Sequence, residues 1–302
     1  MELFQLRDHL PLAKEVLQEV TGTPKENEIL KRLTRRRRRL VNERVRVVNN
    51  LQADLQAVCP GNRWFLNFVL SADTLPQLAR LRKSSLLKIA AVGRKYASVI
   101  QAWQKRAHFS DEVEWVGAMI HEDAERCLEL EEKIKALESK IKEVAKDSTI
   151  AKILLSIPGF GPVCTAELAG EIGTVERFSK EGSLALYLGM ATLDNSSGNY
   201  QGSKQPKHVN TRAKAAMMTA LDRHRKYVAE SQRYYAKKRS EGKKHNQAIR
   251  ALGRHLCRII YKMLKDQREY QLRSEKGNTK AKVRSRSSLK TALRRSKISA
   301  SS

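Results

Sequence analysis

The sequence CLELEEKIKALESKIKEV, residues 127–144, carries the clearest structural signal in the chain. Its apolar side chains recur at alternating spacings of three and four, and charges of both signs fill the positions between them. The seam consists of Cys127, Leu130, Ile134, Leu137, Ile141 and Val144. This pattern predicts one long α-helix with a coiled-coil face, and Asp111-Glu112 marks where it is expected to begin.

A second long helix is expected over residues 28–58, where apolar residues again follow the helical period. Cys59-Pro60-Gly61 ends it, because proline cannot continue a helix and glycine caps one. The two helices could pack as an antiparallel pair, or the coiled-coil face could join two chains. Arg35 to Arg39 form an unbroken basic run, either a solvated helix face or a stripe that contacts phosphates.

The composition favours an all-α protein. The 302 residues include 15 glycines and 7 prolines and are 6% aromatic, whereas β-sandwiches and barrels need many turns and strand-forming aromatics. No apolar run approaches the ~20 residues of a membrane span. The four cysteines are scattered, without the spacing of a zinc site or a disulfide framework. We therefore expect a soluble, cytoplasmic chain with no membrane partner and no metal site.

Positive charge is concentrated in the last third of the chain. Residues 1–200 hold 30 basic and 26 acidic side chains, whereas residues 201–302 hold 29 and 6. So strong a field predicts a polyanionic partner, and nucleic acid is favoured over an anionic membrane because the basic clusters lack the apolar face of an interfacial helix. Residues 271–302 are rich in Ser, Lys and Arg and read as a disordered basic tail.

The sequence ILLSIPGFGP, residues 153–162, followed by an apolar stretch to Gly173, has the pattern of a helix-hairpin-helix. Gly159 and Gly161 would let the backbone approach a phosphate closely, and the N–H groups of the following helix would receive it. An ordinary helix–helix turn is the alternative. Glu167 and Glu171, one turn apart on the second helix, are expected to point away from a phosphate.

A polar segment at residues 193–214 contains Ser196-Ser197-Gly198. Such a segment could present a nucleophilic hydroxyl among phosphate-binding cations, although a Ser-Ser-Gly sequence alone is more often a flexible loop. An alanine-rich helix is expected to follow it.

These stretches in order resemble the C-terminal domain of transposases of insertion-sequence family 110 (116/902-like). The resemblance rests on IPGFGP (157–162), AELAGEIG (166–173), LALYLG (184–189) and SSG (196–198), and upstream on the basic helix from Leu33 to Arg44. It extends over residues 1–265. It implies DNA transposition by recombination that a structured guide RNA directs, with Ser197 as the nucleophile and Ser196 as the alternate. Lys204, Lys207, Arg212 and Lys214 are placed beside the nucleic-acid backbone from their position and charge.

Family members also carry an N-terminal RNase H-like domain whose four acids bind Mg²⁺. That domain is expected to lie upstream of Met1, so no cofactor is expected in this chain, and the resemblance implies a truncated copy. A homo-oligomer, or a partnership with a full-length transposase, would restore the acids.

Four regions are predicted: a helical remnant (1–110), a coiled-coil helix (111–150), a C-terminal transposase domain with the helix-hairpin-helix (151–270) and the basic tail (271–302). The fold class is all-α, a long helical hairpin or coiled coil joined to a compact domain. The predicted function is DNA transposition with DNA binding. The alternative is a non-catalytic helical protein that binds nucleic acid through its backbone.

Overall fold

The structure is a computed structural model, and the residues that it describes form an all-α fold, as predicted. The described residues are 22–61, 66–90, 92–195, 202–204, 206 and 209–272. Two strands of two residues each, β1 (Leu193–Asp194) and β2 (Ser203–Lys204), pair antiparallel in a small ribbon that the sequence did not predict. Within this part of the chain, every helix is too short or too polar to cross a membrane.

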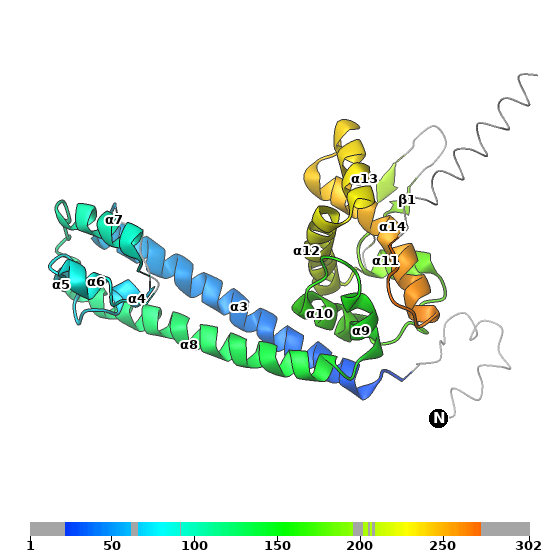
Figure 1. Ribbon diagram of the computed structural model, residues 1–302, viewed down its shortest axis with the longest axis horizontal. Coiled ribbons are helices and arrows are strands. Elements are labelled where there is room, and N and C mark those ends of the chain that lie inside the picture. Colours follow the sequence, from blue (N-terminus) through cyan, green and yellow to red (C-terminus); the bar gives the residue numbers. More distant parts are fainter. Residues whose placement is uncertain are drawn as a thin grey trace, which may run out of the picture.

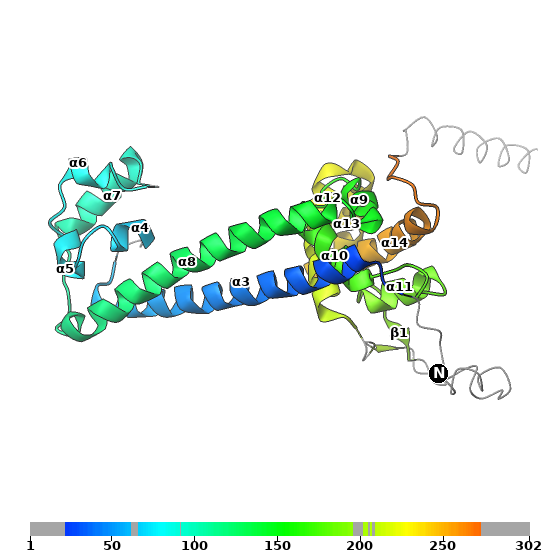
Figure 2. The same ribbon diagram turned by 90° about the horizontal axis from the view of Figure 1, so that it is seen from below.

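The two predicted long helices form an antiparallel hairpin. They are α3 (Lys25–Val58) and α8 (Val113–Ala145), and they lie side by side along most of their length (Figures 1 and 2). Three ion pairs cross between them: Arg37 with Glu138, Arg44 with Glu131, and Glu43 with Arg126. From Arg37 to residues 43 and 44 of α3 the partners on α8 fall from Glu138 to Glu131 and Arg126, as antiparallel helices require. The coiled-coil seam of α8 is thus covered by α3 of the same chain.

A group of short helices connects the far ends of α3 and α8 (Figure 1). They are α4 (Leu66–Val69), α5 (Leu75–Leu78), α6 (Lys83–Leu86) and α7 (Arg94–Gln104). Their core centres on Trp103, whose ring meets those of Phe68 and Phe109 edge to face at 6.0 and 6.2 Å. Leu51, Leu55 and Ile120 of the long helices complete this core.

The other end of the hairpin carries a compact helical unit (Figures 1 and 2). It consists of α9 (Thr149–Leu155), α10 (Pro162–Ile172), α11 (Glu181–Tyr187), α12 (Thr211–Tyr227), α13 (Ala229–Ser240) and α14 (His245–Lys265). One continuous apolar core runs through it from Ile153 to Leu264, and α14 buries a full face in this core. Burial of that face is the main reason for α14 to fold where it does.

The hairpin and the compact unit meet where α10 crosses α3. Gly170 makes this crossing possible, because a Cβ added there would lie 2.5 Å from the backbone nitrogen of Lys31. A small core of three alanines, one leucine and one isoleucine fills the junction: Leu30, Ile141, Ala151, Ala166 and Ala169. Buried polar bonds fix it, since Asn27 of α3 donates to the Gly173 carbonyl at 2.8 Å and accepts from Ser148 at 2.6 Å.

Candidate nucleic-acid interface

The β1–β2 ribbon joins the residues on either side of the serine-bearing segment, residues 196–201. Leu193 pairs with Lys204, and the Asn195 N–H donates to the Gly202 carbonyl at 3.0 Å. Ser196, Ser197 and Lys207 lie outside the described residues. The structure therefore places the base of this segment, and the roles of the two serines and of Lys207 stay predictions.

The start of α12 follows this segment in the chain. Asn210 caps this helix, because its Oδ1 accepts the N–H groups of Arg212 and Ala213, both at 3.1 Å. Arg212 is exposed in the first turn, and Lys204 is exposed on β2. The N-terminus of an α-helix favours anions, and these cations strengthen the effect. Of the predicted phosphate-binding cations, Lys204 thus lies on the ribbon, and Arg212 and Lys214 lie in the first turn of α12.

Gly189 explains how Lys214 is placed. This glycine has a positive φ of 67°, and the space where its side chain would stand is filled by Lys214 and Val209. The aliphatic stem of Lys214 therefore packs against the turn after α11, and Lys214 itself is half-buried.

Gly159 and Gly161 differ in their surroundings. Gly159 has a φ of 88°, and a Cβ added there would lie 2.6 Å from the backbone nitrogen of His224, so α12 covers that side of the turn. The Nδ1–H of His224 also donates a 2.7 Å hydrogen bond to the Pro158 carbonyl. A Cβ at Gly161 would meet nothing within 4 Å. Close packing against α12 accounts for the first glycine, and phosphate binding at either stays a prediction.

The two predicted phosphate sites lie apart along α12. The helical rise of about 1.5 Å per residue separates Thr211 from His224 by about 20 Å. The glycine turn contacts the His224 end, whereas Arg212 and Lys214 lie at the Thr211 end. A nucleic acid that contacted both would have to follow the length of α12.

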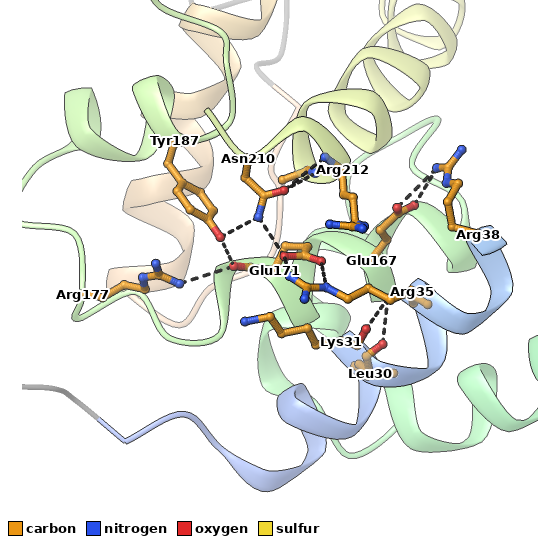
Figure 3. Close-up of polar contacts among 12 residues, drawn as sticks. Leu30, Lys31, Arg35, Arg38, Glu167, Glu171, Arg177, Tyr187, Asn210 and Arg212 are labelled. Atoms are coloured by element: carbon orange, nitrogen blue, oxygen red, sulfur yellow. Dashed lines mark hydrogen bonds and ion pairs between the residues drawn. The ribbon is translucent and has the colours of Figure 1, made fainter. Parts of the chain in front are cut away.

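Glu171, at the end of α10, is the centre of a polar network beneath this surface (Figure 3). Arg35 donates to both of its carboxylate oxygens, at 2.8 and 2.9 Å, and the Asn210 amide donates to one of them at 2.7 Å. Tyr187 donates its hydroxyl to the Glu171 carbonyl and receives the second Asn210 N–H, both at 2.7 Å. We call these four residues, Arg35, Glu171, Tyr187 and Asn210, the Glu171 network.

The Glu171 carboxylate is charged although its side chain is fully buried. Burial opposes the charged form, but the hydrogen bonds from Arg35 and Asn210 outweigh it, and the pKa of Glu171 lies below its ordinary value. A bidentate arginine and an amide donor are the partners that a buried carboxylate needs.

The arginine run on α3 is split between two roles. Arg35, Arg37 and Arg38 pair with Glu171, Glu138 and Glu167 respectively. Arg36 and Arg39 are exposed and make no ion pair with any described residue. Most of the run therefore holds α3 to its neighbours, and only the two exposed arginines fit the predicted solvated face or phosphate stripe. Glu167 and Glu171 point toward α3.

A second cationic surface lies on α13, a helix with no buried residue. Its inner side is held by Tyr234, which bonds His255 at 2.9 Å, and by Tyr235, which bonds His245 at 2.8 Å. Arg233 and Lys237, one turn apart, are exposed and pair with no acid among the described residues. Such a face suits a phosphodiester backbone.

Sequence reasoning did not identify the Glu171 network. Its signal was present in the spacing: two glutamates four apart in an otherwise apolar helix, and arginines three apart on α3. Acids in a buried helix require cationic partners, so this match could have been proposed. Asn210 carried no comparable signal beyond its preference for helix N-caps.

No three His, Cys, Asp or Glu side chains gather to hold a metal ion in the described part of the chain. The described residues therefore offer no set of ligands that fits the Mg²⁺ site implied by the family resemblance.

Comparison with known proteins agrees with the resemblance in the sequence. The family model described as Transposase IS116/IS110/IS902 family matches residues 151–236. The uncharacterized 44.8 kDa protein of insertion element IS116 from Streptomyces clavuligerus is 28% identical over 79% of this chain and 64% of its own length. The uncharacterized 42 kDa protein of insertion element IS900 from Mycobacterium paratuberculosis is 34% identical over 49% of this chain and 37% of its own.

The chain thus spans less than two thirds of the length of these relatives. The family match begins in α9 and ends in α13, so it contains the glycine turn, the serine-bearing segment and Asn210. Residues 151–236 therefore match the model of the IS116/IS110/IS902 family of transposases.

Proposed function

We propose that this chain acts on DNA as part of a transposase, with Ser197 as the nucleophile. The observation that carries the proposal is the pairing of the residues that flank 196–201, since the Asn195 N–H donates to the Gly202 carbonyl. The β1–β2 ribbon joins Leu193 to Lys204 across this segment, and the cations Lys204, on β2, and Arg212, in the first turn of α12, are both exposed. The match to a transposase family over residues 151–236 supports the same activity.

The proposed step is a transesterification at phosphorus. The Ser197 oxygen forms a bond to phosphorus while the phosphorus–oxygen bond to one deoxyribose breaks. The serine proton passes to a base, and the departing deoxyribose oxygen takes up a proton. Nearby cations relieve the charge that builds on the phosphoryl oxygens, and this relief is a large part of phosphoryl-transfer catalysis. In a second step, the hydroxyl at the end of another DNA strand attacks the phosphoserine phosphorus and loses its proton to a base. The bond between phosphorus and the Ser197 oxygen then breaks, and that oxygen takes up a proton as the strands are joined.

The test is recovery of a covalent protein–DNA adduct. The full chain is expressed with the DNA that flanks its own gene, and adducts are isolated under denaturing conditions. Ser197→Ala is expected to abolish the adduct and Ser196→Ala to retain it. The reverse result would move the nucleophile to Ser196, and an adduct in the double variant would exclude both serines.

Partners are proposed from the family resemblance. A structured guide RNA would direct the recombination, and a homo-oligomer or a fuller transposase would supply the Mg²⁺ ligands. The organisation into regions 1–110, 111–150, 151–270 and 271–302 belongs to the same proposal. Co-purification of a discrete RNA with the chain, and its release by ribonuclease, would test the RNA.

A second candidate function is nucleic-acid binding without chemistry. Arg233 and Lys237 of α13 favour it, because both are exposed and pair with no acid in the described part of the chain, and backbone binding needs only such a surface. This function predicts a steep loss of affinity with salt and no effect of Ser197→Ala on any DNA product.

A further inference from the structure

We propose that the far end of the hairpin is a separate nucleic-acid-binding surface, which binds the phosphodiester backbone. The surface belongs to residues 74–110, which contain α5, α6 and α7 and which we call the tip unit. These residues lie outside the family-matched range 151–236 and share no residue with the candidate interface. Binding at the tip unit is independent of Ser197 and of the cations on α13.

The tip unit is basic along its whole length. Its sequence contains no Asp or Glu and eight Lys or Arg residues: Arg80, Arg82, Lys83, Lys88, Arg94, Lys95, Lys105 and Arg106. All eight are exposed, and none makes an ion pair with a described residue. In the arginine run of α3, by contrast, three of the five members are ion-paired. Charge of one sign repels itself and opposes a compact state, so a polyanion that binds the tip unit would stabilise it.

The position of two of these cations is unfavourable for the fold itself. Arg94 and Lys95 lie in the first turn of α7, directly after its N-cap, Gly93. The N-terminus of a helix carries a partial positive charge, so cations there reduce its stability. Lys105 and Arg106 lie at the other end of α7, where the dipole favours them. The first pair therefore lacks a structural explanation among the described residues, and a bound phosphate provides one.

The nearest acids in the sequence are explained by a helix end. Asp111, Glu112 and Glu114 lie at the start of α8, where the helix dipole favours negative charge. None of the three pairs with a cation of the tip unit in the described part of the chain. The tip cations therefore stay free to bind an external anion.

Nucleic acid suits this surface better than an anionic membrane does. An interfacial helix needs a free apolar face, but Ala97, Ile100 and Trp103 of α7 are buried in the core of the tip. The apolar face of α7 is thus already covered. Cations spread over several turns match the repeated phosphates of a nucleic-acid backbone.

The hairpin separates the tip unit from the compact unit, and the two lie at its opposite ends (Figures 1 and 2). Leu55 of α3 belongs to the tip core, and Lys31 lies where α10 crosses α3. A rise of about 1.5 Å per residue places these two points about 36 Å apart, close to one helical turn of B-DNA. A duplex that contacted both ends of the molecule would therefore have to span about one turn or more.

Charge reversal at the start of α7 tests the proposal. Arg94→Glu combined with Lys95→Glu removes two cations and places acids where the helix dipole favours them, so this tip variant should fold at least as well as the wild type. Lys140→Glu combined with Lys142→Glu in α8 is the matched control. Both lysines are exposed and make no ion pair with a described residue, and the change in net charge is the same. Urea unfolding of the full chain checks that both variants fold.

The first readout is binding of the full chain to a DNA duplex and to an RNA duplex of about three helical turns, measured by fluorescence anisotropy at several salt concentrations. For at least one duplex, the tip variant should raise the Kd about tenfold and reduce the slope of log K against log salt by about 2, with much smaller changes in the control. The duplex that loses affinity identifies the nucleic acid. An equal loss in tip variant and control overturns the proposal. So does a tip variant that binds both duplexes normally but no longer binds phosphatidylserine vesicles.

The second readout needs no variant. The lysines of the wild-type chain are acetylated with and without the duplex, and the sites are quantified by peptide mass spectrometry. The duplex should leave Lys140 and Lys142 reactive and protect the lysines of the tip unit: Lys83, Lys88, Lys95 and Lys105. Equal acetylation of the tip lysines in both samples overturns the proposal. Both readouts measure binding alone, so they decide about the tip unit even if Ser197 is not the nucleophile.

Discussion

Gly170→Ala tests the crossing of α10 over α3, on which the Glu171 network depends. The substituted methyl group would lie 2.5 Å from the backbone nitrogen of Lys31 and 2.7 Å from its Cα. Real side chains do not approach backbone atoms so closely, so the two helices would have to separate. Arg35, one turn farther along α3, would move with them.

The two contributions to the change in stability have opposite signs. Overpacking costs about 1–3 kcal/mol, and the upper end applies because the obstructing atoms belong to a helix backbone rather than to a flexible side chain. Alanine in a helix is favoured over glycine by about 1 kcal/mol, which offsets part of this cost. We therefore expect the free energy of unfolding to fall by about 2 kcal/mol.

Urea unfolding of the full chain, followed by far-ultraviolet circular dichroism, measures this change. Gly117→Ala in α8 is the matched control, because a Cβ there meets nothing within 4 Å, and the same substitution should raise stability by up to about 1 kcal/mol. The opposite signs are the distinctive result. A Gly170→Ala variant as stable as the wild type would show that α10 and α3 do not pack at this glycine.

Three further outcomes are expected. Burial lowers the pKa of His224 below its ordinary 6.5, so the contribution of the neutral imidazole to the free energy of unfolding should be complete above pH 6.5 and decrease as the pH drops through the lowered pKa. His224→Gln should therefore reduce the pH dependence of the urea unfolding midpoint. Replacing Arg233 and Lys237 with alanine should weaken duplex DNA binding and reduce the slope of log K against log salt by about 1–2, measured by titration at several salt concentrations. Burial raises the pKa of Cys257 to about 12, so iodoacetamide should label the half-buried Cys164 first and Cys257 only in denaturant, as peptide mass spectrometry would show.

The long-range pattern of the fold was predictable because it depends on periodicity. The apolar seam of residues 127–144 predicted α8, and Cys59-Pro60-Gly61 predicted the end of α3. The sequence left open whether the seam faced α3 or another chain, since charges of both signs suit either packing. The structure shows that the two helices pair antiparallel within one chain, because Arg37 pairs with Glu138 and Arg44, farther along α3, pairs with the earlier Glu131 of α8.

The candidate site was less predictable, because its supporting residues are distant in sequence. Arg35 and Glu171 lie 136 residues apart, and Glu171 and Asn210 lie 39 apart. Charge alone suggested that the arginine run faced solvent or phosphate, whereas three of its members pair with acids. Two of these acids, Glu167 and Glu171, are buried. Net charge predicts the partner of a surface better than it predicts which residues form that surface.

The family-matched segment depends on residues outside it for its own stability. Leu252, Leu256 and Ile260 of α14 complete its core, and Arg35 of α3 neutralises its buried Glu171. A segment of residues 151–236 alone would expose an apolar face and keep a buried carboxylate without its cation, a combination that usually prevents folding. We expect that fragment to aggregate and residues 22–272 to give a cooperative unfolding transition, measured by solubility and circular dichroism. A folded 151–236 fragment would contradict this, and it would mean that Glu171 finds another partner. The AELAGEIG sequence of α10 is therefore best explained as the contact between this segment and the hairpin, since Gly170 admits α3 and both glutamates bind its arginines.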